Sequence, residues 1–441
     1  MILIFKKGLN LPLEKEISGE IIHYKSNKFG IVSDDYISLK PKFEKNPGDL
    51  IKPGDLLFYD AKNRGIRFYS FVNGEVCEIT RGEKRRFISY SFKGEPSVYN
   101  YPENLSKIAL KKENRDKIID IIINSGFWIS IRQRPFDKVA NPDVVPDKIF
   151  AMLIDTRPYS PDVKTILNGN EEYLKMGLKI FSILTKTDLY LIKDKKVTFD
   201  LELENLKIID VSGPHPAGLV GTHINNLYPL NRKRSIWYID YQDIIAIGKL
   251  FRDNIIDNQK VISVAGEGVN NSLYRVYNHA SVDPLIQFNE EIRIISGSPL
   301  HGRKVKNKTN YINRYINIIS SLKEANEREF MGWLKPGLNR FSVKNVFLSK
   351  LLKKEVVFNT SLNGSFRPMV PVGSYEKVCL LDLPITHFLR YLLVEDIEMA
   401  EKLGVLDFGE EDMSVFTFVC VGKYDYAVYL RKILDEIEGE M

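Results

Sequence analysis

The stretch that decides the fold is Val211-Ser-Gly-Pro-His-Pro-Ala-Gly-Leu-Val-Gly-Thr-His223. It follows the apolar run 206–211, which is typical of a buried strand, and it precedes 224–229, where apolar residues resume. Its three glycines therefore lie where a strand ends and the chain turns, and glycine permits close approaches that a side chain would block. In an open α/β sheet, ligands bind at the carboxyl ends of the strands. The stretch thus predicts a binding crevice with a glycine-rich rim, whose candidate residues are Gly213, His215, Gly218, Gly221 and His223.

A second interpretation of the same stretch stays open on the residues alone. The glycine spacing differs from the dinucleotide-binding pattern G-x-G-x-x-G, and no lysine of the phosphate-binding P-loop type follows it. A tight connection stiffened by Pro214 and Pro216 would need no ligand.

The wording of the stretch, Gly-Pro-His-Pro-Ala-Gly-Leu-Val-Gly-Thr-His-Ile, resembles NqrA, the A subunit of the sodium-pumping NADH:quinone oxidoreductase. Further segments resemble the same family and follow in the family's order over essentially the whole chain: 132–136, 241–251, 295–298, 369–376 and 417–424. More distant relatives of that family are the C subunit of the Rnf complex and the flavin-binding NADH subunit of complex I.

The expected fold class is a multidomain α/β and β protein. Residues 1–98 contain short β-type runs between glycine turns and resemble a lipoyl-like barrel-sandwich hybrid. Strands and helices alternate in the middle of the chain, which favours a mainly parallel sheet, and the resemblance implies a Rossmann-like α/β domain over 99–257. It also implies a β-grasp module of the SLBB type over 258–310. A mixed, mainly helical C-terminal region is expected over 311–441.

Individual elements are predicted from apolar spacing and from start and stop residues. Helices are expected over 114–126, 171–185, 241–251, 317–330 and 424–441, and two more over 380–403 with a break near Pro384. Strands are expected over 148–154, 188–192, 206–211, 236–239, 259–266 and 291–297.

Charge and cysteine content restrict the class of protein. The chain has 63 basic and 57 acidic residues, a net charge of +6, without the dense basic run that nucleic-acid binding would need. No apolar run approaches the length of a membrane span, and the first residues lack the features of a signal peptide. The three cysteines are isolated, which excludes a zinc ribbon or a four-cysteine cluster and predicts buried free thiols in a reducing compartment.

Four further polar features have both a functional and a structural interpretation. Arg132 and Arg134, with Lys138 nearby, could meet an anionic ligand or form internal ion pairs in a loop. Lys62 is read as a turn lysine and not as a carrier lysine, because the residues typical of a modification site are missing. Asp155 falls at a strand end, where it could face a ligand, but it is expected to cap the next segment. The acidic run 409–412 is expected to be a solvated cap and not a metal site.

The resemblance implies a peripheral protein on the cytoplasmic face of the bacterial inner membrane. Its partners would be the other subunits of the six-subunit Nqr complex, especially the membrane-embedded B subunit. The complex takes electrons from NADH, reduces ubiquinone and exports sodium. We expect no catalytic residue, metal or cofactor in this chain, because the flavin and iron–sulfur motifs of the distant relatives are missing. Ubiquinone is the candidate ligand of the crevice, with Arg132 and Arg134 as helpers. The alternative is a stand-alone flavin- or nucleotide-binding oxidoreductase that uses the crevice at 211–223.

Overall fold

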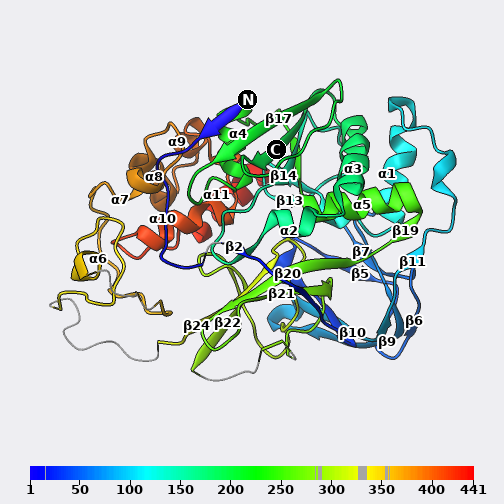
Figure 1. The fold of residues 1–441 in the computed structure, drawn as a ribbon, viewed down its shortest axis with the longest axis horizontal. Helices are drawn as coiled ribbons and strands as arrows, with labels where there is room; N and C mark the ends of the chain where they lie inside the picture. Colours follow the sequence, from blue (N-terminus) through cyan, green and yellow to red (C-terminus); the bar gives the residue numbers. More distant parts are fainter. Residues whose placement is uncertain (15, 284, 287–290, 326–334, 353–355, 357) are drawn as a thin grey trace.

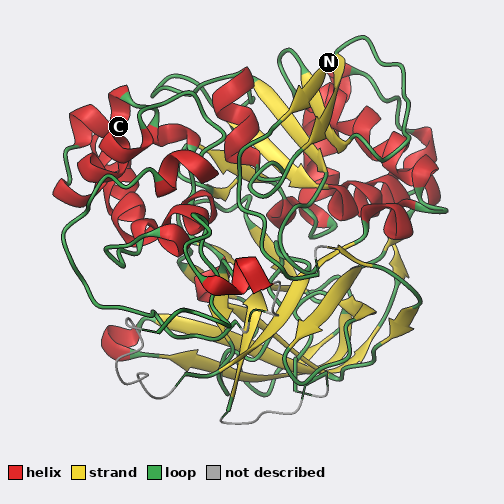
Figure 2. Cartoon of the chain, turned by 60° about the vertical axis from the view of Figure 1, so that its left-hand side comes forward, coloured by secondary structure: helices red, strands yellow, loops and turns green. Residues whose placement is uncertain are grey.

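A computed structural model describes residues 1–441 except 15, 284, 287–290, 326–334, 353–355 and 357. A helix-covered α/β layer lies above two β-sheet modules, and a group of C-terminal helices flanks the α/β layer (Figures 1 and 2). No helix in the described part of the chain combines the length and hydrophobicity that a membrane crossing requires.

The α/β layer is built on a seven-stranded sheet whose first five strands run parallel. In spatial order the strands are β1 (Ile2–Ile4), β17 (Leu206–Ser212), β16 (Leu189–Asp194), β14 (Lys148–Leu153), β18 (Ile236–Asp240), β12 (Arg132–Arg134) and β13 (Lys138–Val139). The predicted strands of the 147–255 region are therefore confirmed as a mainly parallel sheet. Because β16 and β17 lie on one side of β14 and β18 on the other, the strand order reverses between β14 and β18.

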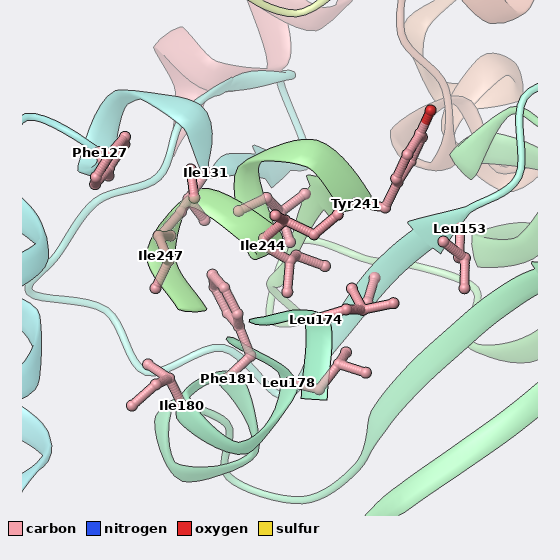
Figure 3. Packing of buried hydrophobic residues seen from close by; sticks show 14 of the residues in the cluster. Phe127, Ile131, Leu153, Leu174, Leu178, Ile180, Phe181, Tyr241, Ile244 and Ile247 are labelled. Atoms are coloured by element: carbon pink, nitrogen blue, oxygen red, sulfur yellow. The ribbon is translucent and has the colours of Figure 1, made fainter. Parts of the chain in front are cut away.

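Both faces of this sheet are buried, because the side chains of each central strand alternate between two cores. Ile149, Ala151 and Leu153 face a core formed with α1 (Arg115–Asn124), α3 (Glu171–Leu184) and α5 (Tyr241–Asp253). Figure 3 shows Leu174, Phe181 and Ile244 interleaved in that core. Gly177 lets α3 approach α5, since a Cβ there would lie 2.2 Å from the carbonyl oxygen of Ile244.

The opposite face packs on α4 and the C-terminal helices. Phe150, Met152 and Ile154 point into this second core. The helices of the second core and its surroundings are α4 (Val220–Leu227), α7 (Ser374–Val378), α8 (Ile385–Val394), α9 (Ile397–Lys402), α10 (Ser414–Val419) and α11 (Tyr426–Glu440). The expected C-terminal helix is confirmed as α11. The expected break near Pro384 is wrong, because Pro384 is the residue before α8 and the break comes at Glu395 and Asp396.

The N-terminal module consists of two small sheets. One sheet has the order β4 (Lys28–Val32), β10 (Phe87–Pro96), β9 (Val72–Arg81) and β6 (Leu50–Ile51), and the other has β5 (Pro41–Phe43), β7 (Leu56–Asp60) and β8 (Arg67–Tyr69). They enclose stacked aromatic rings such as Phe58 and Phe68, whose centroids lie 4.4 Å apart. Residues before Lys28 pair outside this module, since β1 joins the α/β sheet and β3 (Ile21–His23) pairs with β21.

A six-stranded sheet shares one core with the N-terminal module. Its order is β23 (Gly302–Lys304), β22 (Ile292–Gly297), β24 (Ile318–Lys323), β20 (Gln259–Gly266), β21 (Ser272–Tyr277) and β3. The helix expected over 317–330 is wrong in its first half, because residues 318–323 form β24 between β20 and β22; residues 326–330 lie outside the described residues. The sheet therefore extends past residue 310, the expected end of this module.

Short elements connect these units. They are the two-stranded pairs β2 (Glu16–Ile17) with β15 (Ser160–Pro161) and β11 (Tyr99–Asn100) with β19 (Ile255–Ile256), and the short helices α2 (Val163–Leu167) and α6 (Leu348–Leu352). The pairing of β2 with β15 carries the N-terminal segment across the carboxyl ends of the parallel strands.

Candidate functional site

The glycine-rich stretch forms the turn from β17 into α4 and is held by its own hydrogen bonds. His223 shares a 2.8 Å hydrogen bond between its Nε2 and the carbonyl oxygen of Ala217, and Thr222 donates to the carbonyl of Pro216. Gly213 has φ +154°, and a Cβ there would lie 2.8 Å from the Cβ of Phe5. The stretch is therefore a close-packed turn, as the second interpretation of the sequence required.

Both histidines of the turn are buried and neutral near neutral pH. Burial lowers the pKa of His223 to about 4 and that of His215 to about 3, because a charged imidazole would lose its hydration. His215 Nδ1 lies 3.2 Å from the hydroxyl of Thr156, and that hydroxyl also accepts from the amide of Gly218 at 2.8 Å. Thr156 thus ties the turn to the end of β14.

The turn separates two cavities. Gly213 and His215 line one of about 410 Å³, beneath the N-terminal segment that contains Leu9 and Leu11. Gly218 lines another of about 260 Å³, together with Arg132 and Arg134. His223 and Gly221 line neither, and Gly221 instead leaves room for the Asp412 carboxylate, which a Cβ would approach to 2.5 Å. The structure therefore does not gather the seven candidate residues around one crevice.

The smaller cavity lies where the strand order of the sheet reverses, and we call it the central cavity. The ends of β14 and β18 contribute Met152, Ile154 and Tyr238, Ile239, Asp240. Further wall residues are Asp34, Asp35 and Ile37 of the N-terminal module, His301 after β22, Asn313, Tyr315 and Ile316 before β24, and Glu410, Glu411 and Asp412 of the short helix Glu410–Met413. The crevice at the reversal of strand order is where open α/β sheets bind ligands.

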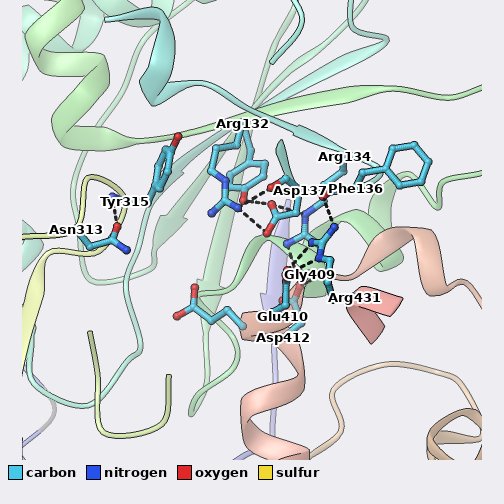
Figure 4. A network of polar contacts seen from close by, with 12 residues as sticks. Arg132, Arg134, Phe136, Asp137, Asn313, Tyr315, Gly409, Glu410, Asp412 and Arg431 are labelled. Atoms are coloured by element: carbon cyan, nitrogen blue, oxygen red, sulfur yellow. Dashed lines mark hydrogen bonds and ion pairs between the residues drawn. The ribbon is translucent and has the colours of Figure 1, made fainter. Parts of the chain in front are cut away.

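A buried ionic network holds one wall of the central cavity (Figure 4). Arg132 and Arg134 pair with Asp137 at 2.9 and 3.0 Å. Arg134 also pairs with Asp412 at 3.1 Å, and the Tyr238 hydroxyl donates to Asp137. Burial alone would raise the pKa of Asp137, but the two guanidinium groups hold it below its usual range. The two arginines therefore form internal ion pairs, which was one of the two interpretations of the sequence. They lie in strand β12 and not in a loop.

A second network closes the wall between the two cavities. Arg157 donates to Asp155 at 2.9 Å and to both carboxylate oxygens of Glu411, at 2.5 and 2.8 Å. Asp155 caps the turn that follows it, because its carboxylate accepts the amide of Arg157, whereas Asp162 caps the helix α2. The expectation that 409–412 is solvated is also wrong, since Glu411 and the buried Asp412 are paired with arginines.

Arg132 is the cation best placed to reach a ligand in the central cavity. Its guanidinium carbon lies 4.6 Å from the ring centroid of Tyr315 and 5.7 Å from that of Tyr238. Only its Nη2 is bonded, to the backbone and carboxylate of Asp137, so Nε and Nη1 remain available among the described residues. Asp240 lines the same cavity and accepts the amide of Gln242 at the start of α5. Burial, followed by the nearby Asp243 charge, raises the pKa of Asp240 to about 7.

Tyr238, Asp240 and Tyr315 were missed by sequence reasoning. Tyr238 lies near the end of the predicted strand 236–239 and Asp240 directly follows it, so the rule that pointed to 211–223 applied to them as well. Tyr315 lies far from both in sequence, and only the packing of the six-stranded sheet brings it to this cavity.

The described residues contain no group of three or more histidine, cysteine or acidic side chains arranged to hold a metal ion. Cys379 and Cys420 are buried, and Cys420 contacts the Tyr375 hydroxyl at 3.1 Å. Cys77 is exposed, so the expectation that all three thiols are buried is wrong. Lys62 is exposed in the loop between β7 and β8.

Two domain models of one family match this chain. They are the N-terminal barrel-sandwich hybrid domain of NqrA, over residues 3–94, and the second alpha/beta domain of NqrA, over residues 113–255. The chain is therefore confirmed to contain a barrel-sandwich hybrid and an α/β domain.

Relatives match over the full length. The A subunit of the Na(+)-translocating NADH-quinone reductase of Hahella chejuensis is 40% identical over 99% of both chains. The proteins of that name from Histophilus somni and Aliivibrio salmonicida are 38% identical over the same shares. A solved NAD+-reducing [NiFe]-hydrogenase in the air-oxidized state reaches a TM-score of only 0.35, with 11% identity over half of each chain. The end-to-end similarity to the curated relatives shows that this chain belongs to the NqrA family, the A subunits of the Na+-translocating NADH-quinone reductases.

Proposed function

We propose that this chain is the peripheral NqrA component of a complex that passes electrons from NADH to ubiquinone and exports sodium. It would lie on the cytoplasmic face of the inner membrane and dock on the membrane subunits, above all the B subunit. Its similarity to NqrA proteins over 99% of the chain is the observation that carries this proposal. NADH would be oxidised by another subunit, and this chain would carry no redox centre of its own.

We infer that the central cavity takes the head group of ubiquinone. A quinone ring is flat and apolar, with carbonyl oxygens at opposite ends that accept hydrogen bonds. The cavity offers the apolar side chains of Met152, Ile154 and Ile239 beside two tyrosine rings. Charged side chains such as Arg132, Asp240 and Glu411 line the same cavity, and a few well-placed polar groups are what fix the orientation of a small ligand.

Arg132 would donate to one quinone carbonyl. Its Nε and Nη1 groups are unbonded among the described residues, and Asp137 and Tyr315 fix the plane of its guanidinium. A hydrogen bond from a charged donor contributes about 1.5–3 kcal/mol. Its loss should therefore weaken binding about tenfold or more.

Equilibrium binding of ubiquinone-1 to the purified chain, measured by titration calorimetry, tests this assignment. We expect Arg132→Gln to weaken binding at least about tenfold and Arg132→Lys to weaken it less. His215→Gln is the matched control, because His215 lines the larger cavity. A loss of affinity in His215→Gln, with none in Arg132→Gln, would place the quinone in the larger cavity instead.

The stand-alone flavin or nucleotide enzyme remains the alternative, and the larger cavity would be its site. That cavity lies over the carboxyl ends of β16 and β17, as a nucleotide site would. However, the carboxylates of Glu16, Asp155 and Asp194 outnumber the two lysines of its lining, Lys195 and Lys196, and carboxylates repel a phosphate group. We therefore favour the quinone-associated member of a larger complex.

The finer fold assignments belong to the same proposal. The strand order of β17, β16, β14 and β18 supports a Rossmann-like domain over 99–257. The six-stranded sheet supports an SLBB-like β-grasp, which is expected over 258–310. The other expected ranges are 1–98 for the N-terminal module and 311–441 for the C-terminal region. Limited proteolysis tests these ranges, because boundaries between domains lie in exposed linkers that proteases cut first.

A further inference from the structure

The segment 335–373 carries the charge imbalance of the whole chain. It contains seven basic residues and one acidic residue, a net charge of +6 that equals the net charge of all 441 residues. The remaining nine-tenths of the chain is therefore electrically balanced. Such a concentration of positive charge in one short segment points to an anionic partner.

The same segment exposes large apolar side chains. Eight of the nineteen large hydrophobic residues that are exposed in the described part of the chain lie between 338 and 370. Leu351 of α6 is 77% exposed and Phe366 is 74% exposed. Scattered exposed leucines are ordinary, but this concentration in a single segment is not. In Figure 1, α6 lies at the left-hand edge of the molecule.

Basic and apolar groups occur together in this segment. Lys350 lies beside Leu351 and Leu352 in α6, and Arg367 follows Phe366. A Cβ at Gly364 would lie within 4 Å of both Lys423 and Arg367, so two cations share one place. None of Lys350, Arg367 and Lys423 has a carboxylate partner among the described residues. The neighbouring positive charge of Arg367 adds to burial in lowering the pKa of Lys423.

The segment is attached to the body of the C-terminal region. The amide of Arg367 donates to the carbonyl of Gly422 after α10, and within the segment the Lys344 ammonium group donates to the carbonyl of Val372. Phe366 packs on Tyr424 with ring centroids 6.2 Å apart. The exposed apolar and basic groups are thus presented by a folded part of the chain.

We propose that residues 335–352 and 358–373 form a contact surface for the anionic headgroups of a lipid bilayer. Exposed leucine and phenylalanine side chains would enter the interface, and Lys350, Arg367 and the neighbouring Lys423 would pair with lipid phosphates. The surface rests on the proposed peripheral role and deepens it, because it would orient this chain on the bilayer next to its membrane partners. A protein partner would require anionic side chains in place of lipid phosphates, and it is the competing outcome of the test.

The test is sedimentation of the purified full-length chain with vesicles. We expect binding to vesicles of phosphatidylethanolamine with phosphatidylglycerol, weaker binding as salt is raised, and little binding to phosphatidylcholine alone. One cation near an anionic surface contributes about a fivefold gain in binding. The double substitution Lys350→Glu/Arg367→Glu should therefore lose about 25-fold or more. Leu351→Ser/Phe366→Ser should lose binding at every salt concentration.

Lys62→Glu/Lys111→Glu is the matched control, because both lysines are exposed, lie in other parts of the fold and produce the same change in charge. It should bind as the wild type does. Equal binding by the control and by Lys350→Glu/Arg367→Glu would overturn the proposal. So would a wild-type chain that ignores lipid vesicles and binds only membranes that hold the other subunits. Ubiquinone-1 affinity should be the same in all these variants, which keeps this test separate from the test of the central cavity.

Discussion

The guanidinium of Arg134 lies 3.1 Å from the carboxylate of Asp412, although 278 residues separate them in sequence. Both side chains are almost completely buried, and the pair joins strand β12 to the C-terminal helices beside the central cavity. The C-terminal region is therefore fixed to the α/β sheet at the wall of the candidate site.

Arg134→Met should destabilise the chain by about 3–5 kcal/mol, because Asp412 would stay buried without its partner. The double variant Arg134→Met/Asp412→Leu should lose less than the sum of the two single variants. Urea unfolding followed by circular dichroism measures these free energies. Arg86→Met is the control, since the Arg86–Asp34 pair is exposed and should contribute less than about 1 kcal/mol. Equal losses from Arg134→Met and Arg86→Met would contradict this account of the network.

Acid should destabilise the chain partly through His223. The unfolded chain takes up a proton near the ordinary pKa of 6.5, whereas the folded chain resists protonation until about pH 4. Stability from this group is complete above pH 6.5 and is lost as the pH falls toward 4, with about 2 kcal/mol gone at pH 5. The stability difference between wild type and His223→Gln should therefore shrink by about that amount between pH 7.5 and pH 5.

His387→Gln is the matched control substitution, because His387 is exposed. His387→Gln should follow the wild type at both pH values. If the wild type and His223→Gln lose the same stability on acidification, burial of the imidazole is not the cause.

Packing of α3 on α5 should not tolerate a methyl group at Gly248. A Cβ there would lie 1.9 Å from the carbonyl oxygen of Tyr173, so the two helices would have to separate. We expect Gly248→Ala to cost about 1–3 kcal/mol of unfolding free energy. Gly439→Ala, in α11, is the matched change, because nothing lies within 4 Å of its added methyl group. It should be neutral or stabilising by up to about 1 kcal/mol. A Gly248→Ala chain as stable as Gly439→Ala would refute the close approach.

Quinone affinity should depend on pH through Asp240. Its pKa of about 7 means that its carboxyl group gains a proton as the pH falls from 8 to 6. A neutral carboxyl can donate to a quinone carbonyl, whereas a carboxylate repels it, so binding of ubiquinone-1 should strengthen toward pH 6. Asp240→Asn, which can still cap α5, should bind with little pH dependence. An unchanged pH profile in Asp240→Asn would exclude this role.

The sequence predicted the α/β layer well and the surrounding contacts poorly. Runs such as 148–154 and 206–211 are long, apolar and bounded by turn residues, so their strand character is local. Isoleucines and a leucine recur among polar residues over 318–323, and this spacing predicts part of a helix. Residues 318–323 form β24 because β20 and β22 offer hydrogen-bond partners on both sides, and such tertiary pairing overrides local preference.

Some residues of the candidate site follow from a local sequence rule, and others are placed there only by tertiary packing. Tyr238 and Asp240 follow from the rule that ligands bind at strand ends, and they could have been named with Gly218. Tyr315 and Asp412 come from other modules, and no local pattern places them beside Arg132 and Arg134. The rarity of histidine in the chain made the two histidines of 211–223 candidate ligand residues. His223, however, forms its hydrogen bond inside the turn, with the carbonyl of Ala217.

The most direct test of the central claim is the content of the purified chain. The chain should be denatured, extracted and assayed for ubiquinone and flavin, and its absorbance spectrum recorded beforehand. The account predicts a colourless protein that retains ubiquinone, and retains less of it in Arg132→Gln. A near-stoichiometric flavin or an iron–sulfur absorbance would contradict it, because the chain would then be an electron carrier in its own right.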